Sequence, residues 1–118
     1  MNFLHRDSVC ERLRLETRQS YRLVGSSRLG LIASDEVVRL LNRSRRGDMP
    51  ACTFIPTDIL KIDELAEELG IDQKKIRAWT RRTKNVPPHF RLNGHTIRFP
   101  LGHFTAWLAQ NSKVTRRS

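Results

Sequence analysis

The sequence predicts a mainly α-helical protein with short β-hairpins, built from two similar units in tandem, and three observations lead to this expectation. Apolar residues in the second half follow a 3.6-residue period that a single glycine interrupts. An Asn-Gly pair flanked by alternating apolar residues follows, which is a strong signal for a hairpin. The first half repeats this pattern at an offset of 56 residues. A chain of 118 residues has room for one ordinary domain or two very small ones.

Two consecutive helices are expected within residues 62–82. We expect Gly70 to adopt the positive φ that ends the first helix, and Asp72 to accept the free amides that begin the second. A glycine at this position is typical of a helix-turn-helix. The apolar positions that keep the helical period on either side of the turn are Ile62, Leu65, Ala66, Leu69, Ile76 and Trp79.

A hairpin that would serve as a wing follows these helices. A two-residue Asn-Gly turn would pair Leu92 with His95, Arg91 with Thr96 and Phe90 with Ile97. One face would then carry the residues that pack on the helices, which are Phe90, Leu92, Ile97 and Phe99. The outward face would carry Arg91, Thr96 and Arg98. A last helix, opened by Pro100 and Leu101, would close the core with Phe104, Trp107 and Leu108.

The first half is expected to contain a weaker copy of the same unit. Arg14 stands where the second unit has its turn glycine, and Thr17 is expected to cap a second helix that runs to Val24. Residues 25–32 would form a shorter hairpin or loop with Arg28 near its tip, before a helix from about 34 to 42. The apolar positions in register with the second unit are Val9, Cys10, Leu13, Leu15 and Leu23.

The whole arrangement is a tandem winged helix-turn-helix, mainly α with short β-hairpin wings. The expected divisions are a degenerate unit at 1–44, a linker at 45–57, a better-formed unit at 58–110 and a disordered basic tail at 111–118. The linker assignment depends on the glycine and prolines of this segment and on its lack of a periodic pattern.

The distribution of charge indicates a polyanionic partner. The formal net charge is +10, and residues 73–118 contain eleven Lys and Arg side chains and no acidic residue. Residues 58–72 contain six acidic residues and one lysine. A solvated helix surface normally mixes charges of both signs, so this asymmetry favours double-stranded DNA over a membrane surface or an acidic protein.

The second helix of each unit is the candidate reading element. An α-helix fits the major groove, where Arg and Lys side chains bind guanine edges and Gln binds adenine. Lys74, Arg77 and Arg81 are the expected readers, and Lys75, Arg82 and Lys84 are expected on phosphates. The remaining candidates are Gln73 and Ala78 on the second helix, Arg91, His95 and Arg98 on the wing, and Arg18, Tyr21, Arg22 and Arg28 in the first unit.

Catalysis, cofactors and metal binding find no support in the sequence. The four histidines are far apart, and Cys10 and Cys52 have neither CxxC nor metal-ligand spacing, so we expect reduced thiols in a cytoplasmic protein that is not an enzyme. No membrane segment and no small-molecule ligand are expected. RNA binding is disfavoured because no aromatic stacking platform is left outside the core.

Specific residues carry a resemblance to a known family. Residues 65–71 (LAEELGI), 76–79 (IRAW), 91–99 (RLNGHTIRF) and 104–108 (FTAWL) are similar to the excisionase-type winged helix-turn-helix, which is close to the MerR DNA-binding domain. The resemblance covers residues 58–110, and residues 8–13 with 21–24 resemble the same motif, which suggests two tandem copies.

The resemblance implies a role in mobile elements such as phages or plasmids. One expectation is a recombination directionality factor that binds and bends attachment-site DNA and acts with an integrase or with another DNA-bound copy of itself. A second is a transcriptional repressor or activator of a mobile element. A third is a docking module, in which one unit binds DNA and the other binds a recombinase, replication or terminase protein.

Overall fold

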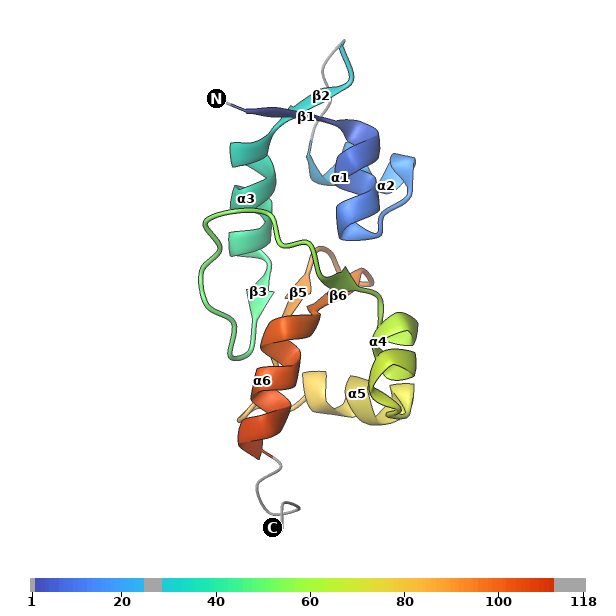
Figure 1. Cartoon of the computed structure of the whole chain (residues 1–118), viewed down its shortest axis with the longest axis vertical. Coiled ribbons are helices and arrows are strands. Elements are labelled where there is room, and N and C mark those ends of the chain that lie inside the picture. The colour runs from blue at the N-terminus through green and yellow to red at the C-terminus, as the bar shows by residue number, and fades with distance from the viewer. Residues whose placement is uncertain (1, 25–28, 112–118) are drawn as a thin grey trace.

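The computed structural model describes residues 2–24 and 29–111. The molecule is elongated, with principal extents of 55 × 25 × 24 Å, and its two halves lie end to end along the long axis (Figure 1). The first half contains β1 (Phe3–His5), α1 (Arg6–Leu13), α2 (Thr17–Leu23), β2 (Leu31–Ala33) and α3 (Ser34–Arg43). The second half contains β3 (Arg45–Arg46), β4 (Ile59–Leu60), α4 (Ile62–Leu69), α5 (Gln73–Thr80), β5 (His89–Arg91), β6 (Ile97–Pro100) and α6 (Leu101–Asn111). The predicted mainly helical chain with small antiparallel sheets is confirmed.

In the second half, the turn between α4 and α5 forms as expected. Gly70 adopts φ 67°, and the Asp72 carboxylate accepts a hydrogen bond from the backbone N–H of Lys74 at 2.9 Å. Both helices pack on β6 and α6 through a cluster whose fully buried members are Leu65, Ile76, Phe99 and Phe104. The predicted beginning of the last helix at Leu101 and the closure of the core by Phe104 are confirmed.

In the first half, the corresponding turn uses a different cap from the one expected. Arg14 ends α1 in the left-handed region with φ 56°. Glu16, and not Thr17, precedes α2 as its cap, because its side chain and that of Gln19 form a reciprocal capping box. Thr17 is instead the first residue of the helix. Strand β1 pairs antiparallel with β2, and α3 begins directly after β2.

The register of the β5–β6 hairpin differs from the prediction by one residue. Phe90 pairs with Arg98 and Arg91 with Ile97, and the Leu92 N–H donates to the Thr96 carbonyl at 2.8 Å. The loop therefore has three residues, 93–95, in place of two. The Asn93 side-chain oxygen explains the longer loop, because it accepts hydrogen bonds from the backbone N–H groups of residues 95 and 96 at 2.9 and 3.0 Å.

This slip reassigns the faces of the hairpin. A shift of one residue moves the side chains of one strand to the opposite side relative to its partner. Phe90 and Leu92 belong to one apolar cluster, whereas Ile97 and Phe99 belong to the other, so the prediction of one shared packing face is wrong. Thr96 and Arg98, which were expected to point outward, are buried.

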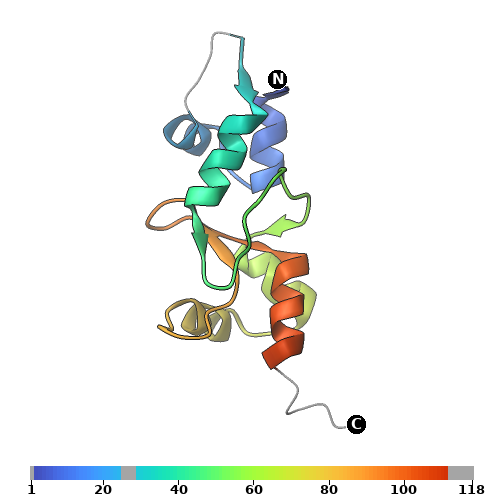
Figure 2. The ribbon, with the colours of Figure 1, turned by 90° about the vertical axis from the view of Figure 1, so that its left-hand side faces the viewer.

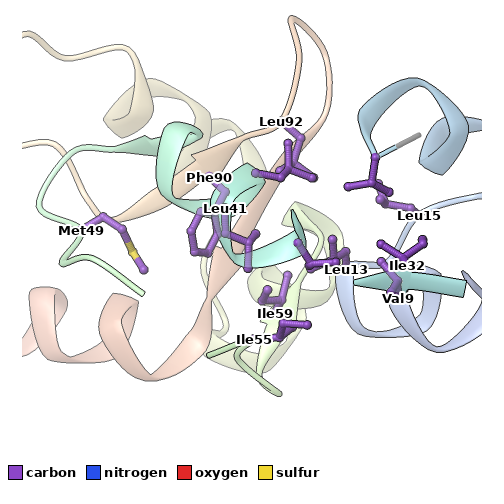
Figure 3. Packing of buried hydrophobic residues seen from close by; sticks show 13 residues of the cluster. Val9, Leu13, Leu15, Ile32, Leu41, Met49, Ile55, Ile59, Phe90 and Leu92 are labelled. Atoms are coloured by element: carbon purple, nitrogen blue, oxygen red, sulfur yellow. The ribbon is translucent and has the colours of Figure 1, made fainter. Parts of the chain in front are cut away.

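The other cluster is a core that both halves share (Figure 3). Leu13 and Ile32 of the first half pack in it with Ile59 and Phe90 of the second. The predicted linker contributes Met49 and Ile55, each 7% exposed, and its β3 pairs with β5 in a four-stranded sheet of order β3-β5-β6-β4. The domain boundaries stay a prediction, but the segment that connects the halves is packed structure.

Cys10 and Cys52 are both free thiols. Within residues 2–24 and 29–111, no three His, Cys, Asp or Glu side chains are grouped so as to hold a metal ion. None of the helices in these ranges is long and apolar enough to cross a membrane.

Candidate nucleic-acid interface

Helix α5 presents a cationic face to solvent. Ile76, fully buried, and the half-buried Trp79 fix the inner side of the helix against α4 and α6. Lys74, Lys75 and Arg77 are exposed, as is Ala78, which leaves this face slim. Gln73 is half-buried at the beginning of the helix. The sequence prediction of one apolar and one basic face is therefore confirmed for α5.

The chain after α5 extends this basic surface and is fixed by the aromatic core. The ring centres of Trp79 and Trp107 lie 5.5 Å apart with the rings tilted at 59°, and the Arg82 guanidinium lies 6.0 Å from the Trp79 ring centre. Asn85 accepts a hydrogen bond from the Trp107 indole N–H at 3.2 Å, which anchors the turn. The exposed cations of this segment are Arg81, Arg82 and Lys84.

A cleft of about 320 Å³ lies between α5, the hairpin and the beginning of α4. Its cationic lining residues are Lys61, Arg77, Arg81, Arg91 and Arg98, and His95 also lines it. Asp63 is the acidic lining residue. The excess of positive charge, open to solvent between a helix and a hairpin tip, is suited to a phosphate backbone.

Arg98 occupies this region in a way that the sequence did not indicate. It is 9% exposed, and its guanidinium donates hydrogen bonds to the carbonyl oxygens of Leu13 at 2.9 Å, Arg14 at 2.6 Å and Ile97 at 2.8 Å. Burial lowers the pKa of Arg98 from its ordinary value, while nearby Glu64 and Asp63 act to raise it. The predicted outward orientation of Arg98 is wrong, because the register slip turns it toward the first half.

In the first half, α2 exposes the three residues that were predicted on it. Arg18, Tyr21 and Arg22 are all exposed, and the Arg6 guanidinium lies 3.9 Å from the Tyr21 ring centre. Arg18 also forms an exposed ion pair with Glu16 at 3.4 Å. Arg28 lies outside the described residues.

A second cleft, of about 420 Å³, separates α2 from the hairpin tip. It is lined on one side by Glu16, Arg18, Gln19 and Arg22, and on the other by Asn93, His95 and Thr96. His95 lines both clefts, so the hairpin tip lies between α2 and α5. Figure 2 shows α2, the orange hairpin tip and α5 along the same side of the molecule.

Sequence reasoning missed Lys61, which lines the first cleft from its place before α4. It is the one lysine in the acidic segment 58–72, and this isolation was the available signal. Its nearness to the hairpin depends on the pairing of β4 with β6, which the sequence did not predict.

Comparison with known proteins bears on the second half. Residues 59–112 match the family model of a helix-turn-helix domain. This match supports a helix-turn-helix DNA-binding family for the segment that holds α4, α5, the hairpin and α6. No curated protein and no solved structure is significantly similar to the chain.

Proposed function

We propose that the protein binds double-stranded DNA sequence-specifically, with α5 in the major groove and the β5–β6 hairpin tip on the adjoining backbone. The observation that carries this proposal is the cationic cleft between α5 and the tip, within the segment that matches a helix-turn-helix domain. A helix is about 10–12 Å in diameter and the major groove is about 12 Å wide, so the slim face of α5 can approach the base edges.

The exposed cations of α5 and of the segment that follows it divide into two groups in this arrangement. Lys74, Arg77 and Arg81 share one face at a spacing of three and four residues and would contact guanine edges. Lys75 on α5 and Arg82 and Lys84 in the segment after it are exposed and would contact phosphates.

The first half is proposed to make a second DNA contact through Arg18 and Arg22 of α2. The long axis of 55 Å exceeds the rise of about 34 Å per turn of duplex. Because α2 and α5 lie along one side of the molecule, they can occupy successive major grooves (Figure 2). One chain would then read the two half-sites that a helix-turn-helix dimer usually reads.

For the biological role, we propose a recombination directionality factor of the excisionase kind, which binds and bends attachment-site DNA and biases an integrase toward excision. The resemblance of residues 65–71, 76–79, 91–99 and 104–108 to excisionases supports this role. A transcriptional regulator of a mobile element would use the same surface, and the location of its sites, at a promoter and not at an attachment site, would identify it.

A docking role for the first half is a second candidate, and Tyr21 favours it. This side chain is 53% exposed and held under Arg6, and exposed aromatic residues are enriched at protein interfaces. In that case α2 would bind a recombinase, replication or terminase protein while α5 binds DNA.

The test uses duplexes that the full chain selects from a random 30-bp library. We expect Arg77→Ala to lose sequence preference by about 1–3 kcal/mol at one position, since a bidentate contact to guanine is removed. Lys75→Ala should weaken binding to all duplexes alike and reduce the slope of log K against log salt by about 1.

The two variants control for each other because both remove one exposed cation from α5. Equal effects on preference and salt slope would contradict the assignment of the reading face. Failure of the wild-type chain to enrich any sequence would contradict sequence-specific binding itself. A footprint on DNA that flanks the protein's own gene would then place the sites at an attachment site or at a promoter.

A further inference from the structure

The β5–β6 hairpin lies between the two halves and contacts both. Phe90 and Leu92 pack in the cluster that contains Val9 and Leu13 of α1, whereas Ile97 packs in the cluster of α4, α5 and α6. The observed register, in which Phe90 faces Arg98, makes this division possible. The hairpin is therefore a part of the interface between the halves and not an appendage of the second half alone.

Hydrogen bonds fix the hairpin to the turn between α1 and α2, and an ion pair joins the same turn to α4. Arg98 binds the carbonyl oxygens of Leu13 and Arg14 at 2.9 and 2.6 Å, and it is buried. The Arg14 guanidinium forms an ion pair with Glu64 of α4 at 3.2 Å. The charge-assisted hydrogen bonds of the buried Arg98 restrict movement of the hairpin relative to this turn, whereas the Arg14–Glu64 pair is partly exposed. The reading helices α2 and α5 are thus held at a fixed separation.

The exposed tip of the hairpin faces both reading helices. His95 lines the cleft on the α5 side together with Arg77 and Arg81, and the cleft on the α2 side together with Arg18 and Arg22. The tip itself is small and exposed, since residues 93–95 are Asn, Gly and His. A slender tip with hydrogen-bonding side chains suits the minor groove, which is about 6 Å wide.

We propose that the β5–β6 hairpin is one wing shared by both helix-turn-helix units. The chain would then bind a DNA site made of two half-sites at one fixed spacing, and the hairpin tip would lie at the minor groove between them. This inference rests on the proposed DNA-binding function. It adds that the spacing of the two half-sites is set by the fold and that His95 contacts the DNA for both half-sites.

The first experiment measures the spacing. The full chain selects duplexes from a random 30-bp library, and the half-site spacing of the enriched duplex is then increased by 5 bp. We expect enrichment of two half-sites at one spacing, and a loss of affinity of about 10-fold or more upon insertion, because 5 bp turns one half-site to the opposite side of the helix. Unchanged affinity after the insertion would overturn the proposal.

The second experiment compares His95→Ala with His103→Ala. Both histidines are exposed, and His103 lies on α6 outside both clefts, so it is a matched control. We expect His95→Ala to remove hydroxyl-radical protection of the minor groove between the half-sites and to weaken binding to duplexes that carry either half-site alone by a similar factor. His103→Ala should leave the footprint unchanged.

If His95→Ala weakens binding only to the half-site bound by α5, the shared wing is overturned while the proposed DNA binding stands. The same holds if the footprint of His95→Ala equals the wild-type footprint. Selection that enriches a single half-site would likewise overturn it. If no duplex is enriched and none is bound, the proposed function fails, and the inference fails with it. The two failures are therefore distinguishable.

Discussion

The two helix pairs, α1–α2 and α4–α5, have their helices at matching positions but differ in their interiors. The first helices, α1 and α4, begin at Arg6 and Ile62, and the second helices, α2 and α5, begin at Thr17 and Gln73. Both pairs of starting positions therefore keep the offset of 56 residues. At matching buried positions the second segment has Ile76 and the first has Ser20. The same backbone path is therefore compatible with an apolar and with a polar contact.

In the first segment, a hydrogen bond takes the place of the apolar contact of the second. Arg6 takes the position of Ile62, and its guanidinium donates to the Ser20 hydroxyl at 2.7 Å, with both residues buried. The Ser20 hydroxyl in turn donates to the Thr17 carbonyl at 2.6 Å. A buried hydrogen bond contributes less than a buried aliphatic side chain, since its formation also gives up bonds to water. The comparison indicates that the buried contact of the first segment contributes less to stability than that of the second.

The first prediction compares the matched buried positions. Ile76→Ala should lower the free energy of unfolding by about 3 kcal/mol, because it leaves a cavity among Leu65, Phe99 and Phe104. Ser20→Ala should cost about 1–2 kcal/mol, because it leaves a donor of Arg6 without its hydroxyl partner. Urea denaturation of both variants measures the difference. A larger loss for Ser20→Ala would reverse the comparison.

The second prediction concerns the joint between the segments. Arg98→Met should lower the free energy of unfolding by about 2 kcal/mol, because the carbonyl oxygens of Leu13 and Arg14 lose their donor. Arg91→Met is the control, since Arg91 is on the opposite face of the same hairpin and is half-exposed. If the two substitutions have equal effects on the urea midpoint, the joint does not contribute as described.

The third prediction concerns the turns. Gly70→Ala should cost about 1 kcal/mol, because residue 70 has φ 67° and a Cβ there meets no atom within 4 Å, so the backbone conformation alone is penalised. Arg14→Gly should change stability by less than about 0.5 kcal/mol, because relief at φ 56° is offset by loss of the ion pair with Glu64. Thermal unfolding measures both. Arg14→Asn, which tolerates this φ, isolates the ion pair.

The fourth prediction concerns the pH dependence of stability that arises from β5, a strand of the second half with no counterpart among the described residues of the first. His89 of β5 is 1% exposed, and its Nδ1–H donates to the Pro87 carbonyl at 2.9 Å. Burial lowers the pKa of His89 from its ordinary value, the Pro87 hydrogen bond acts to raise it, and Arg91 and Arg46 lower it further.

The unfolded chain therefore binds a proton more readily than the folded one. The free energy of unfolding should be constant above about pH 7 and fall by about 1 kcal/mol toward pH 5.5, as the histidine of the unfolded state becomes charged. Urea denaturation of wild type and of His89→Gln at pH 5.5 and 7.5 measures this dependence. A variant with the same pH dependence as wild type would assign the effect to other groups.

The local elements followed from the sequence because their causes are local. The period of Leu65, Leu69 and Ile76, the glycine at position 70 and the cap at Asp72 fixed α4 and α5, and the cationic face of α5 followed from the same spacing. The offset of 56 residues located the helices of the first half, since it depends only on the order of apolar positions.

The relations between distant segments were decided by the tertiary structure. The hairpin has a three-residue loop in place of the expected two-residue loop, and in this register Arg98 contacts Leu13, 85 residues away, instead of facing outward. The packing of Met49 and Ile55 and the position of Lys61 in the cleft depend likewise on which strands pair. Sequence patterns encode the period and the caps of each element, whereas register and the contacts between elements are set by competition among many weak interactions that no local pattern contains.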